Sequence, residues 1–525
     1  MAKVMEPVDA VVVGTGAAGS LMAAVLAEAG KDVLVLERGH ARKLTDLYSS
    51  QIWARRLKWA SPHVVEDGPD SIWFNFNAGH GYGGAAVHHY AVWPRFHEDD
   101  FVEKSRYGRS LDWPFDYSEL RPFYDLVQKE VGISGDAEKE IWRPPGDPYP
   151  MPPVLVSNHG FVIARGFAAL DMHTSPLPMA ILTQPYNGRP PCIWDGWCDA
   201  GCPIGALANP LAVYLPRAEK AGARLQPDSH VTRVLMDKTG KKATGVEYFT
   251  PSGEAVIQPA DHVVLCAFTI ENVRILLNSA NTNHPNGVAN SSGTLGRYLM
   301  SHPAVGISGL FEDEMQNYFG ATGGQLLCQD AFGKKSDPGG AFGSRHWEIA
   351  LALKPNDMLG IAMTRPEIFG AKLHGFMQDG AHHMGSMVGV CEDEALPQNR
   401  IELASEKDKF GYPLARIVYK TSAEGLKLWR TAAAEGVKIF EAAGAREAWH
   451  GPQGGQHIMG GTIMGTDPAS SVLNSVGQAH DVSNLFVAGP GVFPTSSAAN
   501  STFTAKAVAM KSAMFMVENW GNLNA

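Results

Sequence analysis

The sequence predicts an α/β fold with two lobes, and three features of the chain predict it. Its 525 residues are enough for one large two-lobed protein with an ample core. Near the N-terminus, apolar segments at 9–13 and 31–37 flank a glycine-rich turn and a helical segment. Near the C-terminus, the apolar segment 484–488 runs into a glycine- and proline-rich turn and then a helical segment at about 500–518. We expect the second unit to return to the sheet that the first unit starts.

Composition and charge restrict the partners. Hydrophobic residues make up 45% of the chain and charged residues 19%, which is ordinary for a globular protein. The net charge is −10 and there is no basic block, so nucleic acid and anionic membranes are poor partners. The start of the chain lacks the basic and apolar regions of a signal peptide. The apolar stretch 8–30 is interrupted by glycines and carries Glu28, so we expect no membrane span.

The N-terminal glycines form a dinucleotide-binding pattern. Gly14 permits a tight turn, Gly16 lets backbone N–H groups meet a pyrophosphate at a helix N-terminus, and Gly19 lets the helix pack on the strand. Glu37 ends the second strand, where it can accept hydrogen bonds from a ribose diol. The alternative is a glycine-rich turn without a ligand. The pattern alone does not separate FAD from NAD.

Longer segments resemble the glucose–methanol–choline (GMC) oxidoreductases over nearly the whole chain. His457 in GGQHIMGGTIMG (454–465) and Asn500 in NLFVAGPGVFPTSSAANSTFT (484–504) resemble the catalytic end of that family. The segment 81–96 resembles its flavin-contacting loop, and 112–135, 230–234, 262–280 and 397–403 resemble further family segments. Two departures affect fine contacts: Ala267-Phe268 replaces the usual Ala-Gly, and the flavin loop lacks the common Thr or Ser. Within the family, the chain resembles the large catalytic subunits of bacterial flavin dehydrogenases for glucose, gluconate, sorbitol and fructose.

The resemblance implies a Rossmann-like FAD-binding domain and a substrate domain built on an antiparallel sheet. We expect the FAD-binding domain to be discontinuous, with segments 1–110, 206–303 and 451–525. Segments 111–185 and 304–450 would form the substrate-binding domain, and 186–205 a separate cysteine loop near the lobe junction.

The resemblance also assigns roles to single residues. Alcohol oxidation removes a hydroxyl proton and a hydride from one carbon, so His457 would serve as base and the neutral amide of Asn500 would orient the hydroxyl. His88 stands where some relatives attach flavin covalently, although a non-covalent contact is the alternative. Five aromatic residues could form a sugar-stacking wall or simply pack the core: Trp73, Phe74, Phe76, Tyr90 and Trp93. The expected FAD contacts are Gly14, Gly16, Ala17, Ala18, Gly19, Glu37, Arg38, Gly83, Gly84, His88, His89, Val231, Gly489 and Thr502.

Three of the six cysteines, Cys192, Cys198 and Cys202, lie within eleven residues. Small and turn-forming residues separate them and Pro203 follows the last, which predicts an iron–sulfur loop. Zinc would want a fourth ligand nearby, a disulfide would leave one cysteine over, and buried inert cysteines would not need this spacing. Three local thiolates favour a [3Fe–4S] cluster. A [4Fe–4S] cluster would need a fourth ligand, from Cys266, Cys328, Cys391 or elsewhere.

These signals together predict a dehydrogenase. A flavin collects two electrons as hydride and an iron–sulfur centre carries one at a time, so electrons would leave to an external acceptor. The expected substrate is a secondary alcohol of a sugar, glycoside or polyol. The alternatives are a non-sugar alicyclic alcohol, or a non-catalytic electron-transfer subunit.

The sequence also bears on partners and compartment. No Cys-x-x-Cys-His motif is present, so any c-type haem lies on a partner. The resemblance implies a small chaperone-like subunit that bears the export signal, and a c-type cytochrome acceptor. The chain would then be periplasmic through co-export, with cytoplasmic residence as the alternative.

Overall fold

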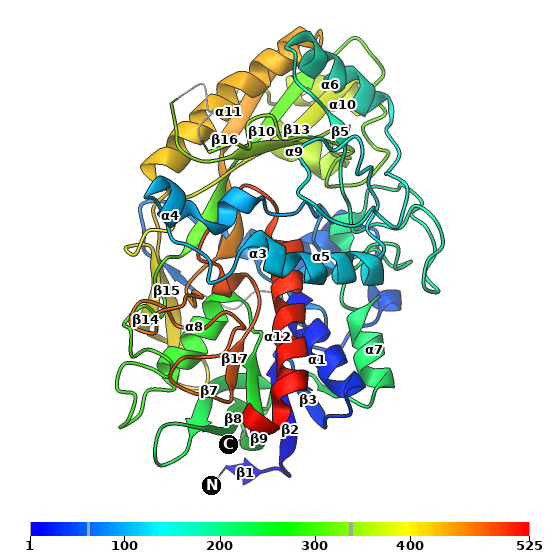
Figure 1. The fold of residues 1–525 in the computed structure, drawn as a ribbon. Coiled ribbons are helices and arrows are strands. Elements are labelled where there is room, and N and C mark those ends of the chain that lie inside the picture. The colour runs from blue at the N-terminus through cyan, green and yellow to red at the C-terminus, as the bar shows by residue number, and fades with distance from the viewer. Residues whose placement is uncertain (1, 60–63, 335–339, 524–525) are drawn as a thin grey trace.

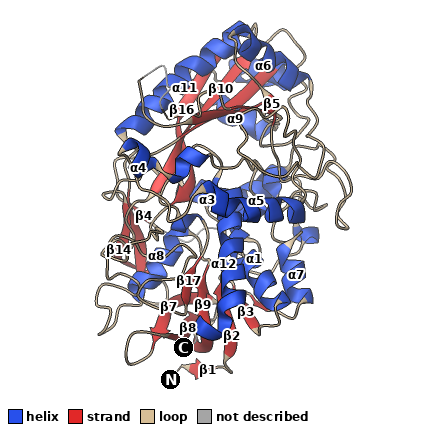
Figure 2. Cartoon of the chain, viewed as in Figure 1, coloured by secondary structure: helices blue, strands red, loops and turns tan. Residues whose placement is uncertain are grey.

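The computed structural model describes residues 2–59, 64–334 and 340–523 (Figure 1). The described chain forms two lobes, each built on its own large sheet, with short helices between them (Figures 1 and 2). The first lobe, lower in Figure 1, holds both chain ends. The second lobe, upper in Figure 1, is made of the middle of the chain. This arrangement is the two-lobed α/β fold that the sequence predicts.

The sheet of the first lobe contains eight described strands in the order β6-β3-β2-β9-β8-β7, with β1 and β17 also paired to β9. Strand β2 is parallel to both neighbours and reads VDAVVV, an almost fully buried apolar run that suits a parallel strand covered on both faces. Strand β17 pairs in parallel with β9, so the C-terminal unit returns to the N-terminal sheet as expected. The strands are β1 Lys3–Val4, β2 Val8–Val13, β3 Val33–Leu36, β6 Arg224–Gln226, β7 His230–Met236, β8 Ala243–Phe249, β9 Ala255–Leu265 and β17 Leu485–Val487.

Helices pack on this sheet at close range. Helix α1 contacts both α12 and α7, and α12 also contacts α5 (Figure 1). A Cβ atom on Gly19 would lie 2.0 Å from the Gly14 carbonyl oxygen, so α1 approaches the sheet this closely only because the residue is glycine. The helices are α1 Ala17–Glu28, α5 Tyr117–Val131, α7 Tyr214–Lys220, α8 Thr269–Asn278 and α12 Ser501–Leu523.

The second lobe is built on a six-stranded sheet, all of whose pairings are antiparallel, in the order β16-β10-β13-β12-β11-β5. Helix α11 packs against the sheet and against α6, and their apolar side chains form a second core. The strands are β5 Ser175–Pro176, β10 Met300–Leu310, β11 Leu326–Cys328, β12 Arg345–Ile349, β13 Met384–Cys391 and β16 Glu447–Met459. The helices are α6 Asn158–Ala169, α9 Pro355–Ala362, α10 Ala371–His383 and α11 Ala423–Ala442.

A three-stranded sheet of β14 Arg400–Lys407, β15 Pro413–Val418 and β4 Val65–Glu66 packs beside α8. Strands β10 and β16 cross the expected boundaries at 303/304 and 450/451, and they pair with one another. The proposed division into domains therefore cuts a continuous pair of strands, and it stays a prediction.

Short helices complete the described chain. They are η1 Leu44–Asp46, α2 Gln51–Trp59, α3 Phe74–Asn77, η2 Gly84–Val87, η3 Glu98–Phe101, α4 Glu103–Tyr107, η4 Cys198–Ala200 and η5 Pro490–Val492. Among the helices of the described ranges, none is long and apolar enough to cross a membrane.

Candidate active site

One large cavity is lined by both lobes. The glycine turn before α1, the segment 74–92, the connection from β9 to α8, the end of β16 and the start of α12 all contribute to its wall. Two residues of the predicted FAD set, Gly19 and Gly83, are not part of this wall. The predicted residues on the wall are Gly14, Gly16, Ala17, Ala18, Glu37, Arg38, Gly84, His88, His89, Val231, Gly489 and Thr502, together with His457 and Asn500.

The glycine turn forms a cradle for an anionic group. Gly14 has a φ of +100°, and a Cβ atom there would lie 2.5 Å from the Cys266 carbonyl oxygen. Gly16 precedes α1 without a side-chain cap, and no acidic residue lies in the first turn. The free N–H groups and the positive end of the helix dipole therefore face the cavity, which fits a pyrophosphate.

Glu37 holds two loops together. Its Oε2 atom accepts hydrogen bonds from the backbone N–H and the hydroxyl of Thr15, at 3.0 and 2.7 Å. Its Oε1 atom accepts from the N–H groups of Gly39 and Gly81, each at 2.9 Å. The carboxylate therefore ties the glycine turn to the flavin-loop segment. Its predicted contact with a ribose diol stays a prediction.

Phe268 marks one departure from the family pattern. It lines the cavity just before α8, where the family usually has glycine, and its φ is +75°. With a ψ of +158°, this is a conformation that is essentially confined to glycine, so surrounding contacts must hold the phenylalanine there.

Two histidines form a close pair, and one of them lines the cavity. The Nδ1 atoms of His302 and His457 are 3.0 Å apart, and the Nε2 atom of His302 is 3.1 Å from the carbonyl oxygen of Ser496. His302 is fully buried, whereas His457 is partly buried and lines the cavity. The pairing of β10 with β16 brings them together, because His302 stands opposite Gln456 in the register.

These contacts fix the tautomer of each neutral ring. A carbonyl oxygen only accepts, so His302 carries its proton on Nε2 and offers a lone pair at Nδ1. His457 must then donate from its own Nδ1. Its Nε2 atom is left unprotonated, and it lies 3.4 Å from the amide nitrogen of Asn500. A basic nitrogen and an amide thus stand side by side in the cavity.

Asn500 is oriented by a buried carboxylate. Its Nδ2 atom donates to Glu348 Oε1 at 2.8 Å, and Glu348 itself lies 3.5 Å from His346 Nε2. The Oδ1 atom of Asn500 and the Nε2 atom of Gln456 are buried without partners among the described residues. Both residues line the cavity and can bind hydroxyl groups of a ligand.

The backbone of His457 is strained. Its φ is +60°, a conformation that non-glycine residues rarely adopt, and its N–H donates to Asn77 Oδ1 at 2.8 Å. Such strain is characteristic of residues held for function. Burial, together with the neighbouring His302 and His346, lowers the pKa of His457 well below its ordinary value. Burial also lowers the pKa of His302, to about 4. Both rings are therefore neutral at pH 7.

The predicted aromatic wall is present only in part. Phe74, Phe76 and Tyr90 line the cavity. Trp93 is fully buried and stacks on Phe503, so for this residue the core-packing alternative holds. Trp73 is 44% exposed and lies outside the cavity lining.

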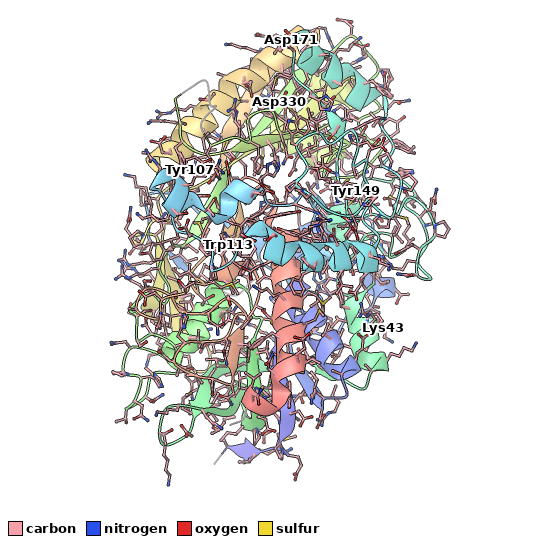
Figure 3. All side chains as sticks on the ribbon, viewed as in Figure 1. Lys43, Tyr107, Trp113, Tyr149, Asp171 and Asp330 are labelled. Carbon is pink, nitrogen blue, oxygen red and sulfur yellow. The ribbon has the colours of Figure 1, made fainter. Side chains whose placement is uncertain are left out.

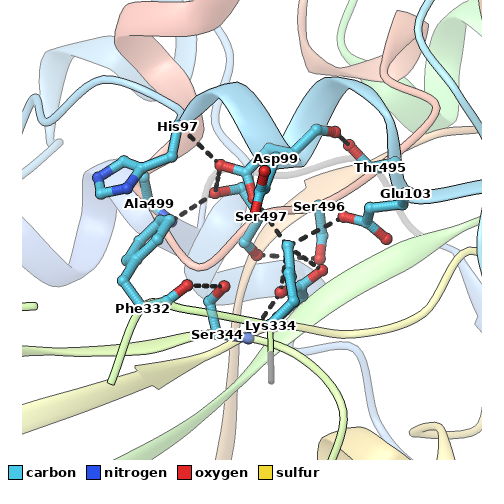
Figure 4. A network of polar contacts seen from close by, with 12 residues as sticks. His97, Asp99, Glu103, Phe332, Lys334, Ser344, Thr495, Ser496, Ser497 and Ala499 are labelled. Carbon is cyan, nitrogen blue, oxygen red and sulfur yellow. Dashed lines mark hydrogen bonds and ion pairs between the residues drawn. The ribbon is translucent and has the colours of Figure 1, made fainter. Parts of the chain in front are cut away.

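A buried ion cluster holds the segment before Asn500 (Figure 4). The Nζ atom of Lys334 lies 2.7 Å from Asp100, 3.1 Å from Glu103 and 2.6 Å from Glu392. These carboxylates form the one group of potential metal ligands gathered within 4.8 Å in the described ranges, and the ammonium group already contacts all three. Burial opposes the charge of Lys334, yet the attraction of the three carboxylates raises its pKa well above the ordinary value. We therefore interpret the cluster as structural.

Asp100 connects the ion cluster to the segment 495–497, which precedes Asn500. Its carboxylate accepts from the Ser497 hydroxyl at 2.7 Å, and its carbonyl accepts from the Thr495 hydroxyl at 2.7 Å. Thr495 in turn accepts a hydrogen bond from the indole of Trp113, which is labelled between the lobes in Figure 3. Ser496, whose carbonyl sets the tautomer of His302, lies between these two anchored residues.

The cysteine loop contacts both lobes. Backbone N–H groups point at all three sulfurs: Trp194 at Cys192 (3.3 Å), Thr322 at Cys198 (3.5 Å) and Leu207 at Cys202 (3.4 Å). Positive φ angles at five residues curve the chain around the sulfurs, as in backbone nests that hold anionic groups: Trp194, Gly196, Gly201, Cys202 and Gly205.

The spacing of the sulfurs distinguishes possible metals. Thiolates on a tetrahedral zinc ion would lie about 3.8 Å apart, given a Zn–S bond of about 2.3 Å. The three sulfurs, all in the described part of the chain, are not gathered within 4.8 Å as a set. Burial raises the pKa of all three thiols, that of Cys192 to about 12. In this arrangement the three sulfurs are spaced too widely for one tetrahedral zinc ion, and any metal group that they bind would deprotonate the thiols.

Sequence reasoning missed His302, Glu348 and Asn77. Each reaches the site through a contact with a residue more than 150 positions away. His302 adjoins a proline in a segment without a glycine pattern, and Glu348 lies in an ordinary buried strand. The register of the second sheet places His302 and Glu348, and the contact of α3 with β16 places Asn77.

The fold and the cavity define a nucleotide-dependent oxidoreductase with its reactive groups at the lobe junction. Residues 177–304 and 395–509 match profiles described as GMC oxidoreductase, and residues 9–73 match an FAD binding domain. The chain is 30% identical to 2-methyl-1,2-propanediol dehydrogenase of Mycolicibacterium austroafricanum, over 99% of this chain and 96% of that protein. The chain belongs to the GMC oxidoreductase family and is an FAD-dependent enzyme, as its motifs predict.

Two further relatives and one solved structure are similar to this chain over nearly its whole length. The fructose dehydrogenase large subunit of Gluconobacter japonicus is 28% identical over 96% of this chain and 97% of its own length. The gluconate 2-dehydrogenase flavoprotein of Pantoea cypripedii is also 28% identical, over 99% of this chain and 95% of its own length. The crystal structure of pyridoxine 4-oxidase from Mesorbium loti covers 97% of this chain and 99% of its own, with a TM-score of 0.67 at 16% identity, which shows the shared fold.

Replacing Lys334 by methionine should destabilise the protein strongly. The change leaves three buried carboxylates without their cation, and breaking a buried ion pair in this way costs about 3–5 kcal/mol. Equilibrium urea denaturation of the flavin-loaded protein measures the loss. Lys427→Met is the matched control, because Lys427 is half exposed in its pair with Glu424 and should cost at most about 1 kcal/mol. Equal losses for the two variants would contradict the anchoring role.

Proposed function

We propose that this enzyme is a dehydrogenase that oxidises a secondary alcohol of a sugar, glycoside or polyol. The unprotonated Nε2 atom of His457 beside the amide of Asn500, in the cavity that also holds the glycine cradle, carries the proposal. The names of two relatives support this substrate class, because they specify fructose and gluconate, whereas the diol in the name of a third has a primary and a tertiary hydroxyl. The buried, unpaired polar atoms of Gln456 and Asn500 suit a substrate with several hydroxyl groups.

The 3.4 Å contact between His457 Nε2 and Asn500 Nδ2 is long for a hydrogen bond, and a substrate hydroxyl can take its place. That hydroxyl would donate to His457 and accept from Asn500. As His457 removes the proton, the Asn500 N–H stabilises the negative charge that develops on the oxygen. Glu348 keeps the amide in this orientation, since it accepts the other N–H of Asn500.

Bound FAD supplies the hydride acceptor, at N5 of its ring. Gly14, Gly16 and the first turn of α1 would hold its pyrophosphate. The remaining predicted contacts on the cavity wall, His88 and His89 among them, would surround the rest of the cofactor. Both histidines are tied to the backbone: His88 Nε2 lies 3.3 Å from the Ala78 carbonyl, and His89 Nδ1 accepts from the N–H of Ala91.

Cys192, Cys198 and Cys202 would hold an iron–sulfur cluster, which supplies a one-electron carrier between the flavin and an external acceptor. The N–H groups that point at the sulfurs support this assignment. Cys266 follows β9, and Cys328 and Cys391 lie in the core of the second lobe, so a three-thiolate [3Fe–4S] cluster remains our proposal.

The proposed electron path also implies partner proteins. One relative is a large subunit by name, which supports a small chaperone-like subunit here. A c-type cytochrome is the proposed acceptor, and co-export with the small subunit would bring the chain to the periplasm.

His457→Ala should retain FAD but lose turnover by roughly 10²–10⁴-fold, because general-base catalysis contributes this much. Anaerobic bleaching of the flavin by a panel of sugars and alcohols first identifies a substrate, and steady-state turnover with that substrate then compares the variants. The loss of turnover in Asn500→Ala should be smaller, since water can replace one hydrogen bond. A His457→Ala enzyme with turnover within about twofold of wild type would refute the assignment of the base.

Cys198→Ser should separate the two half-reactions. Substrate should still reduce the flavin at a near wild-type rate in an anaerobic single turnover, while electron delivery to a protein acceptor should fall steeply. Stopped-flow and steady-state assays on one flavin-loaded preparation measure both rates. Cys328→Ser is the matched control, a buried cysteine outside the loop, and both of its rates should stay unchanged. Wild-type rates in both assays for Cys198→Ser would show that the loop is not on the electron path.

A further inference from the structure

Glu348 places a buried carboxylate on the cavity wall, beside the proposed reacting groups. It lies on β12, its side chain is 4% exposed, and it lines the cavity together with His457 and Asn500. Among the described residues, one hydrogen-bond donor contacts the carboxylate: Asn500 Nδ2, which lies 2.8 Å from Oε1. A buried carboxylate is costly unless a cation or several donors balance it. A single amide donor leaves most of that cost unbalanced.

The nearest basic group does not complete the carboxylate. Within the described ranges, His346 holds the one basic nitrogen within 4.0 Å of Glu348, with its Nε2 atom 3.5 Å from Oε1. Neither ring nitrogen of His346 makes a hydrogen bond there. The two residues stand two positions apart on β12, so their side chains share a face of the strand and come close for that reason alone. A neutral imidazole at this distance leaves the negative charge of Glu348 without a cation.

The other two carboxylates of the described cavity wall are balanced within the protein. Glu37 accepts four hydrogen bonds from the two loops that it joins. Glu271 lies 3.2 Å from Arg274 and 3.8 Å from Arg38. Of these three cavity-lining carboxylates, Glu348 alone has neither four donors nor an arginine. Its charge is therefore available to a ligand.

A substrate brings further groups within reach of Glu348. In the proposed geometry the substrate hydroxyl accepts one N–H of Asn500, and Glu348 accepts the other. The two N–H bonds of an amide diverge by about 120°, so with hydrogen bonds of about 2.9 Å the hydroxyl oxygen and Glu348 Oε1 lie about 5 Å apart. A charged group on the carbon next to the carbinol can therefore contact the carboxylate.

We propose that Glu348 determines specificity through the charge of the group next to the oxidised carbinol. The site favours amino sugars and amino polyols, which carry an ammonium group on the neighbouring carbon, and disfavours sugar acids. The inference rests on the proposed function and narrows its substrate class. An ammonium group supplies the missing cation and donates to Glu348, whereas a carboxylate at the same place is repelled by it.

The reaction is the same for each of these substrates. The hydroxyl proton passes to His457, the carbinol carbon loses its hydride to bound FAD, and a carbonyl group forms. Glu348 takes no part in these transfers, so its charge should act on binding and not on the identity of the product.

The test compares three probes that share one skeleton and differ only at the first carbon. Glucamine carries an ammonium group there, sorbitol a hydroxyl and gluconate a carboxylate. Titration calorimetry at pH 7 measures the Kd of each probe on FAD-loaded enzyme that dithionite has reduced without air, because reduced enzyme cannot turn the probes over. Wild type should bind glucamine at least about tenfold more tightly than gluconate, with sorbitol between them.

Variants assign this preference to Glu348. Glu348→Gln keeps an acceptor for Asn500 and removes the charge, so the ratio of the gluconate Kd to the glucamine Kd should fall at least about tenfold. Glu348→Asp keeps the charge and should retain most of the preference. Glu271→Gln is the matched control, a cavity-lining carboxylate that arginines already balance, and it should leave the ratio unchanged.

Three results would overturn the inference. Wild-type enzyme that binds gluconate as tightly as glucamine would show that a protonated His346 already neutralises Glu348, whatever the variants do. Wild-type enzyme that does not bind glucamine is the second result, and an equal fall of the ratio in Glu271→Gln is the third. Failure of every sugar and alcohol to bleach the flavin would instead refute the proposed function, so the two failures are distinguishable.

Discussion

The hydrogen bond between the Nδ1 atoms of His302 and His457 is the interaction on which the proposed chemistry depends. It places the free lone pair of His457 at Nε2, next to Asn500. Two long-range arrangements maintain it: the pairing of β10 with β16, and the Ser496 carbonyl that fixes the proton of His302. The pairing of β10 with β16 belongs to the sheet of the second lobe. The Ser496 carbonyl belongs to the C-terminal segment, which returns to the first lobe.

The buried ion cluster explains how a loop can hold that carbonyl in place. Lys334 and its three carboxylates join the segments around Asp100, Glu103 and Glu392, and Asp100 binds residues on either side of Ser496. Charges buried this deeply persist only when they are paired and hydrogen-bonded. Within the cavity, Asn500 Oδ1 and Gln456 Nε2 are buried without partners, as expected of groups that would bind a substrate.

The parts of this enzyme that could be predicted from sequence are those encoded by local spacing. Gly14, Gly16 and the cysteines of the loop lie within short segments, and β2, α1, β3 and β17 form where the apolar patterns place them. His302 and Glu348 could not be predicted, because strand register decides what they touch. Trp93 could be assigned to the flavin loop from sequence, but its role could not. It packs in the core, and an aromatic residue type alone does not distinguish core packing from ligand contact.

The most direct measurement of the central claim is the pH dependence of anaerobic flavin reduction in the wild-type enzyme at saturating substrate. The base must be unprotonated, and burial with two neighbouring imidazoles lowers the pKa of His457. The rate should therefore remain within about twofold between pH 7.5 and 5.5. An imidazole with an ordinary pKa of about 6.5 would keep only about one-tenth of its unprotonated form at pH 5.5. A roughly tenfold loss of rate across this range would contradict a base that is neutral at pH 5.5.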